Sequence, residues 1–498
     1  MQNNTSLLWS VIFLEKGKMR CEKDMGSKMI KEDSVYMTLL KYDCDLFRGE
    51  KGITEYIPDH LKQYYRDIEE ATKVESYFVG ETFLELLRGK LELLYEICEE
   101  IPKILDNYDQ GFLNAAYMQS TKLFEKVKPY FFRRGLLVEN DGRYYRIRRG
   151  DHRVKDATSS KVQKAELFHI KKEMRSKIGA YRYSVAGYPC LYLTSNIELG
   201  WFECGMPKQF SYCEMIIDKE DEESSPLIDF ANRSIDVVFV TAQIILNARR
   251  RNVEIREDVY KCLLNYIITY PFAAVCSVKV KDRECNFVEE YIFPQLLMQW
   301  IRESDDIDGV CYKSSLNSNL VDDVVAVNVA LPVKKFREDG LDENLTSKIS
   351  VSDIEYIDVN KYFKKYKDIL NEVRAYKNSL RAYEVESAYC GRYLKDFINV
   401  CECVMKTYDA LMEGNYENSD LLFNHVGRLH DYATLMYQSR EMLIQETINS
   451  ANERQQERLD ENEIRKQFEQ FNNLMGQIFS EDTIFDFQFK QLKNYEKI

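Results

Sequence analysis

The hydrophobic pattern of this chain changes twice along its length, and that change constrains the fold more than any single motif. Between about residues 33 and 134, apolar residues recur at three- and four-residue intervals, as in Leu91, Leu94 and Ile97, which is typical of helices with one apolar face. From about 142 to 333 the pattern turns to short β-rich segments separated by turns, and from about 353 onward it is helical again.

A chain of 498 residues is longer than one hydrophobic core normally supports, so we expect several units. We predict an α+β protein with a helical N-terminal region over residues 1–140, a mixed α/β module over 141–335 and a helical C-terminal region over 336–498. The charged segment 332–347 lacks apolar periodicity and contains Gly340, so it is predicted to be a linker.

The strands of the central module are predicted from runs of β-branched and aromatic residues bounded by turn residues. One uncharged stretch, 262–278, is shorter than the roughly 20 apolar residues that a membrane-spanning helix needs. We expect it to be a buried helix that ends before Pro271, followed by a strand. The predicted strands are 190–194, 210–217, 273–280, 309–312 and 324–331.

The charge balance disfavours two classes of partner but not a small anionic ligand. There are 69 basic and 82 acidic residues, a formal net charge of −13, which disfavours binding to nucleic acid or to anionic membranes. The apolar segment 7–14 is followed by Glu15 and preceded by no basic residue, so it is a poor secretory signal. We therefore expect a cytoplasmic protein without a membrane or nucleic-acid partner.

Cysteines and histidines give little sign of a metal site. The 13 cysteines include no CxxC pair, which is typical of free thiols in a reducing compartment. Zinc ligation by Cys401, Cys403, His425 and His430 is one interpretation, but their spacing matches no zinc pattern, and packing within helices is favoured. We expect no metal. His169 is likewise interpreted as a structural histidine.

Four arginines lie between positions 143 and 149 in a predicted strand. Strand alternation places Arg146 and Arg148 on one face. Two neighbouring guanidinium groups suit a pyrophosphate, because each offers paired donors and a fixed positive charge. Taken alone, the same residues are better explained as a solvated basic edge strand.

A turn, a strand and a helix follow in quick succession over residues 187–205. Gly187 favours the turn, and residues 190–194 are extended. Ser195 and Glu198 have the spacing of a capping box, and Gly205 is a plausible helix stop.

Two side chains of this unit are candidates for chemistry. Tyr192 projects from the strand, and Glu203 lies about two turns into the helix, beside Trp201 and Phe202. A carboxylate in apolar company has to be paired, protonated or functional, so Glu203 is predicted not to be freely solvated. The alternative is an exposed helix glutamate. Farther along, a predicted strand ends in Ser314 and Ser315, which suit either a phosphate or ribose contact or a turn.

The ordered set of motifs resembles the RES-domain family. The matching pieces are YYRIRRG at 144–150, LFHI at 167–170, RYSVAGYPCLYLTS at 182–195, Glu203 eleven residues after Tyr192, EYIFPQLLMQW at 290–300 and DGVCYKSS at 308–315. The resemblance covers about residues 140–335. It implies a fold similar to ADP-ribosyltransferases and an activity that cleaves the nicotinamide–ribose bond of NAD⁺. By position, it assigns Arg146, Tyr192 and Glu203 to catalysis, and Arg148, Arg182 and either Ser314 or Ser315 to substrate binding.

The chemistry agrees with the resemblance. Nicotinamide in NAD⁺ is already a cationic leaving group, so one carboxylate that stabilises an oxocarbenium-like ribose suffices. No GxGxxG opens a βαβ unit, so NAD⁺ is expected as a substrate and no cofactor is expected. The acceptor of the ribose, water or phosphate, is left open.

Two other functions compete with NAD⁺ degradation by a glycohydrolase or phosphorylase. One is transfer of ADP-ribose to a macromolecule, which would use the same Glu203. The other is a non-catalytic helical interaction protein with a decayed central module. Because compact members of the family are toxins that pair with an antitoxin, we expect a toxin or antiphage defence effector. Its flanks, or a regulatory protein, would restrain activity, and its C-terminal helices are candidates for self-association.

Overall fold

The computed structural model describes residues 33–358, apart from 45, 75, 77, 132–141, 154–165, 218–226, 256, 283–284 and 315–326, together with single positions between 399 and 466. The predicted C-terminal helices and self-association, as well as Cys401, His425, His430 and Ser315, therefore lie outside the described residues.

Helices fill the described part of the N-terminal region, as the apolar spacing predicts. In α4, the residues Ile53, Ile57, Leu61, Tyr64 and Ile68 are buried at three- to four-residue intervals, so one face enters the core. The N-terminal elements are α3 (Ser34–Leu39), α4 (Ile53–Ala71), α5 (Gly80–Arg88), α6 (Leu91–Asp109), α7 (Leu113–Val127) and the 3₁₀ turn η1 (Lys128–Tyr130).

The predicted break at Pro271 is wrong. Helix α11 runs from Glu257 to Ser277 straight through Pro271, so no strand occupies 273–280. Nearly every residue from Val259 to Cys276 is buried, and this packing outweighs the roughly 3 kcal/mol that an interior proline costs a helix. By length and composition α11 could cross a membrane, but 83% of its apolar window is buried inside the fold. It is a core helix of this structure.

Eight strands form one mixed sheet, which confirms the predicted α+β class. The order is β4-β5-β6-β2-β1-β3-β7, with β8 also beside β3, and only β4 and β5 are parallel among the pairs of this sheet. Predicted strands 190–194, 210–217 and 309–312 are confirmed. The bounds are β1 (Arg143–Arg149), β2 (Cys190–Thr194), β3 (Gln209–Ile217), β4 (Leu227–Phe230), β5 (Gly309–Lys313), β6 (Val327–Pro332), β7 (Ile349–Val351) and β8 (Glu355–Asp358).

The sheet is nearly interrupted between β1 and β2. These strands are in register only where Tyr145 faces Thr194, whereas β1 pairs with β3 along its whole length and β2 pairs likewise with β6. The two halves of the sheet therefore separate beyond one junction. Helix α9 (Ile197–Glu203) packs on both β1 and β2 at this place.

The prediction that segment 332–347 is a linker is also wrong. Segment 332–347 is built into the module: the buried Asp342 caps α13 (Glu343–Lys348) by accepting from the Leu345 N–H, and it also accepts from the N–H groups of Lys334 and Lys335. Strands β7 and β8, which follow, pair with β3, so the sheet extends past residue 335 into the region predicted to be helical. The many charged residues of this segment suggested a linker. Instead, the Asp342 carboxylate accepts hydrogen bonds from three backbone N–H groups and so holds the segment in the fold.

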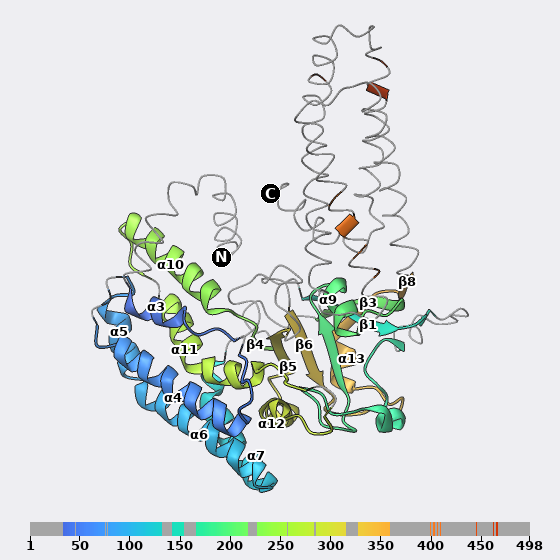
Figure 1. The fold of residues 1–498 in the computed structure, drawn as a ribbon, viewed down its shortest axis with the longest axis horizontal. Helices are drawn as coiled ribbons and strands as arrows, with labels where there is room; N and C mark the ends of the chain where they lie inside the picture. The colour runs from blue at the N-terminus through green and yellow to red at the C-terminus, as the bar shows by residue number, and fades with distance from the viewer. Residues whose placement is uncertain are drawn as a thin grey trace.

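The N-terminal helices share a core with the central module. Figure 1 shows α11 between the N-terminal helices and the sheet, with α12 (Ile292–Glu303) below. Phe124 of α7 packs 5.3 Å from Trp300 of α12, and the Tyr36 hydroxyl donates to Thr241 of α10 (Ser234–Arg250). One continuous apolar cluster joins these elements, while a second covers the other face of the sheet. Among the described residues, the first cluster contains side chains from both sides of the predicted boundary near residue 140.

Candidate active site

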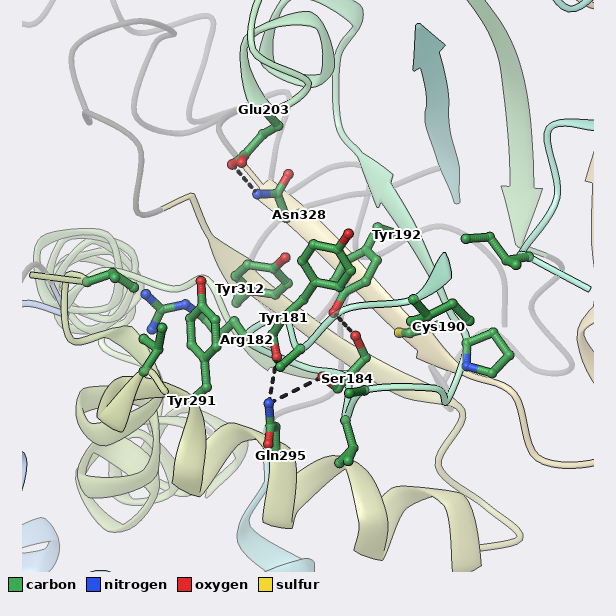
Figure 2. A pocket seen from close by; sticks show the side chains of 18 of the residues that line it. Tyr181, Arg182, Ser184, Cys190, Tyr192, Glu203, Tyr291, Gln295, Tyr312 and Asn328 are labelled. Carbon is green, nitrogen blue, oxygen red and sulfur yellow. Dashed lines mark hydrogen bonds between the residues drawn. The ribbon is translucent and has the colours of Figure 1, made fainter. Parts of the chain in front are cut away.

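A cavity of about 990 Å³ lies beside the place where β1 and β2 separate. Its walls come from β1, β2, the end of α9, the segment around 178–189 and the segment that precedes α12 (Figure 2). Arg146, Arg148, Arg182, Tyr192 and Glu203 all line it. The candidates that the sequence placed far apart are thus brought to one cavity.

Helix α9 carries Glu203 to the cavity. The Asn196 side chain caps this helix by accepting from the Leu199 N–H at 2.7 Å, so the predicted cap at Ser195 is one residue early. Gly205 ends the helix with a positive φ of 76°, and the Met206 N–H donates to the Trp201 carbonyl, as in a Schellman motif. The predicted stop at Gly205 is confirmed.

Gly200 lets α9 lie close to the sheet. A Cβ atom at this position would stand 2.0 Å from Cδ1 of Ile147 in β1 and 2.8 Å from Cγ2 of Thr194 in β2. Because Glu203 follows one turn later, this close packing fixes how far its side chain reaches into the cavity.

The Glu203 carboxylate is anchored by two donors, one just after β5 and one on β6. Its Oε1 accepts from Ser314 Oγ at 2.5 Å and from Asn328 Nδ2 at 2.8 Å. Ser314 and Asn328 are both buried, while Glu203 is exposed. Figure 2 shows the Glu203 carboxylate beside the Asn328 amide. Glu203 was predicted to be paired, protonated or functional: its side chain is exposed, but its Oε1 is paired by two hydrogen bonds, while Trp201 is buried and donates to the Pro207 carbonyl. Both donors meet Oε1 of Glu203, and within the described residues its second oxygen, Oε2, forms no hydrogen bond.

The sequence analysis did not identify Asn328 as a site residue. An asparagine in the otherwise apolar strand VNVALP was the available signal, because a buried amide needs a partner.

Arg146 is the predicted arginine that keeps donor capacity at the cavity. Its Nη1 donates to the Tyr192 carbonyl at 2.8 Å, while its buried Nε has no hydrogen-bond partner among the described residues. Arg149, which the sequence analysis did not select, also lines the cavity and is held by a 2.8 Å hydrogen bond from its Nε to the Cys204 carbonyl, at the end of α9.

Arg148 and Arg182 line the cavity but direct their N–H groups to backbone carbonyls. Arg148 donates to the carbonyls of Glu166 and Phe168 at 2.7 and 2.8 Å, and burial next to Arg146 lowers its pKa to about 10. It remains charged at neutral pH.

Arg182 donates to the carbonyls of Cys276 and Val278 at 2.7 and 2.9 Å, and its guanidinium lies 5.7 Å from the centre of the Tyr291 ring. These contacts make both arginines parts of the cavity's framework.

Aromatic rings form the middle of the cavity (Figure 2). The Tyr192 hydroxyl donates to Ser184 Oγ at 3.0 Å, and its ring meets Tyr181 edge-on at 6.2 Å. Burial raises the pKa of Tyr192 and of Tyr312 well above the ordinary value, and the nearby Glu203 raises that of Tyr312 further. Both are therefore neutral phenols at physiological pH, suited to packing and hydrogen bonding and not to proton abstraction.

His169 is structural, as predicted. Its Nδ1 lies 2.9 Å from the Ile170 carbonyl, and its Nε2 accepts from the Asp342 N–H at 2.8 Å, which fixes the proton on Nδ1. Burial lowers its pKa, so the ring is neutral. No cluster of three or more metal-ligating side chains occurs in the part of the chain that the structure describes.

The sequence is similar to that of a known protein. No protein-family model matches the chain, and no solved structure matches it. The sequence is 27% identical over 319 residues to a protein of Bacillus subtilis (strain 168) named "Putative toxin YopC". The match covers 62% of this chain and 65% of that protein, so the chain spans somewhat less than two thirds of its relative. The similarity suggests a toxin family and leaves the reaction open.

Proposed function

We propose that this protein is a cytoplasmic, toxin-like enzyme that cleaves the nicotinamide–ribose bond of NAD⁺. The observation that carries the proposal is the Glu203 carboxylate, whose Oε1 is held by Ser314 and Asn328 at the wall of a cavity that Arg146 also lines. The order of motifs that resembles the RES-domain family and the similarity to a protein named as a toxin support it.

The proposed reaction breaks the bond between C1′ of the ribose and the pyridinium nitrogen. The bonding electrons leave with nicotinamide, which departs as a neutral molecule and needs no general acid. The ribose becomes oxocarbenium-like, and the negative charge of Glu203 stabilises it. Attack by water on C1′ then gives ADP-ribose and a proton, which the carboxylate accepts or directs to solvent. Attack by phosphate would give the 1-phosphate instead.

The cavity suits a dinucleotide in size and in charge. Its volume of about 990 Å³ lies at the upper end of the range for ligand pockets, roughly 300–1,000 Å³. Arg146 and Arg149 are the arginines proposed to bind the pyrophosphate, because each donates to one backbone carbonyl, whereas Arg148 and Arg182 each use both terminal nitrogens on two carbonyls. The exposed rings of Tyr181 and Phe287 at the cavity offer stacking surfaces for a heterocycle.

The test is nicotinamide release from NAD⁺ by the full-length protein and by a Glu203→Gln variant, followed by chromatography. The amide keeps the shape and removes the charge, so we expect a loss of about 100- to 1,000-fold, the typical size of one preorganised electrostatic contact. A Glu214→Gln variant is the control, because Glu214 lies on β3 and pairs with Arg143 away from the cavity lining. Equal rates for wild type and Glu203→Gln would refute the role of Glu203.

The same assay separates the alternatives. Radiolabelled ADP-ribose that appears on a protein or nucleic acid, and depends on Glu203, would identify a transferase. Absence of nicotinamide release under all conditions would favour the non-catalytic interaction protein.

A further inference from the structure

One wall of the cavity belongs to the segment between α11 and α12. Its described residues Cys285, Asn286, Phe287, Val288, Tyr291 and Ile292 line the cavity, and we call this stretch, 285–292, the aromatic wall. It includes the 3₁₀ turn η3 (Glu289–Tyr291), whose Tyr291 ring lies beside Arg182. Within the turn, two consecutive glutamates, Glu289 and Glu290, connect the wall to the N-terminal helices.

Arg48, from the N-terminal region, is clamped to both glutamates. Its Nε donates to Glu290 Oε1 at 2.7 Å, and its Nη2 lies 3.7 Å from Glu289 Oε2. The side chains of Arg48 and Glu290 are only 8% and 2% exposed, so this is a buried ion pair. Arg48 Nη1 also donates to the Lys51 carbonyl, which fixes the guanidinium to its own loop.

Glu289 and Glu290 make further hydrogen bonds, one of which also joins the aromatic wall to the N-terminal helices. Glu289 Oε2 accepts from the N–H of Ile53, the first residue of α4, at 2.8 Å, so a residue of the wall caps a helix of the N-terminal region. Glu290 Oε1 also accepts from the Lys281 N–H at 3.2 Å. Tyr108 of α6 lines the cavity as well. The N-terminal helices thus contribute both a lining residue and the anchors of the aromatic wall.

We infer that Arg48 is a positioning residue for the substrate cavity and that the N-terminal helical region is an integral part of the substrate-binding unit. This inference rests on the proposed function. Within the described residues, the contacts of Arg48 are with Lys51, Glu289 and Glu290, and not with Glu203, Ser314 or Asn328. Arg48 acts on binding through the aromatic wall, where the substrate's rings pack. Without Arg48, Glu290 would be a buried carboxylate without its counter-charge, and the wall would move to hydrate it.

The experiment compares Arg48→Met, Arg48→Lys and Arg88→Met in the full-length protein. Methionine keeps much of the length of the side chain and removes the charge. Lysine keeps the charge but not the fork that reaches Glu290 and Lys51 together. Arg88 is the matched control: it also joins a carboxylate, Glu81, to a carbonyl, that of Thr72, but both partners lie in the N-terminal helices and neither belongs to the aromatic wall.

Two measurements are made on each variant. For nicotinamide release, Arg48→Met is expected to raise KM for NAD⁺ about tenfold or more while kcat changes less than about threefold, since only binding contacts shift. Arg48→Lys is expected to fall between it and wild type, and Arg88→Met to leave KM unchanged. Hydrogen–deuterium exchange is expected to quicken in peptides that cover 285–292 in Arg48→Met, and not in Arg88→Met.

Each outcome bears on the inference. A merely structural role would lower the active fraction, and so the apparent kcat, while leaving KM and the exchange of the aromatic wall unchanged; that result overturns the inference. Exchange that quickens without a change in KM also overturns the substrate-positioning role. If wild type releases no nicotinamide, the proposed function fails, while the exchange measurement still decides whether Arg48 holds the wall.

Discussion

The two hydrogen bonds to Glu203 lead to a prediction about how substitutions of Glu203, Ser314 and Asn328 combine. Ser314 and Asn328 donate to the same oxygen, Oε1, at 2.5 and 2.8 Å. If their function is to orient the carboxylate, their removal matters only while the carboxylate is charged. We therefore predict that Ser314→Ala and Asn328→Ala slow nicotinamide release in the wild type and have no further effect in a Glu203→Gln background.

The magnitude follows from the two hydrogen bonds. A hydrogen bond to a charged group contributes about 1.5–3 kcal/mol. Because Glu203 is exposed at the cavity, the lower end applies, and each single variant should lose about tenfold in kcat/KM. The double variant should lose about 100-fold and no more than Glu203→Gln does alone.

The assay is nicotinamide release at NAD⁺ concentrations well below KM, with thermal unfolding of each variant to confirm that it is folded. In the Glu203→Gln background, either alanine substitution should change kcat/KM by less than about twofold. A further tenfold loss from Ser314→Ala in that background would refute the reasoning, because the serine would then act on the substrate independently of the carboxylate.

Three further predictions concern helix position, charge and pH. Gly200→Val forces α9 away from Ile147, so kcat should fall at least about tenfold and stability by about 1–3 kcal/mol, measured by rates and urea unfolding; wild-type values for both would contradict the close packing. Arg149→Gln should raise KM for NAD⁺ about tenfold with no change in the unfolding midpoint, and an unchanged KM would remove this arginine from substrate binding. Burial lowers the pKa of His60 from 6.5 to about 4, so stability present above pH 6.5 is lost as pH falls toward 4, by about 3 kcal/mol. His60→Gln should flatten that dependence in urea titrations between pH 4 and 7, and an unchanged slope would assign the acid sensitivity to other groups.

Local patterns were sufficient for much of the fold. Alternation and β-branching located β2, β3 and β5, and Gly205 ended α9 as predicted, since these features depend on neighbouring residues. Pro271 misled the prediction because its cost is local, whereas the burial that compensates comes from elements distant in sequence. The same applies to segment 332–347, which the Asp342 carboxylate folds into the module.

The sequence identified which residues belong to the site, but it did not predict which groups their side chains contact. Strand alternation placed Arg148 on the face of Arg146, the family resemblance assigned Arg182 to substrate binding, and the structure brings all three to the cavity. An arginine's identity gives its number of donors but not which acceptors they meet, so the carbonyl partners of Arg148 and Arg182 were unforeseeable. The bond from Arg48 to Glu290 joins positions 242 apart, and no sequence period indicates such a pair.

The lone register pair between Tyr145 and Thr194 has a consequence for how this cavity can vary. The arginines of β1 stand on one half of the sheet, while Asn328 and Ser314 follow the other half, and a single backbone pairing joins β1 to β2. Beyond that pairing, the packing of α9 on both strands keeps the halves at their distance. Substitutions in this packing would change the width of the cavity over evolution while Arg146, Arg149 and Glu203 stay the same.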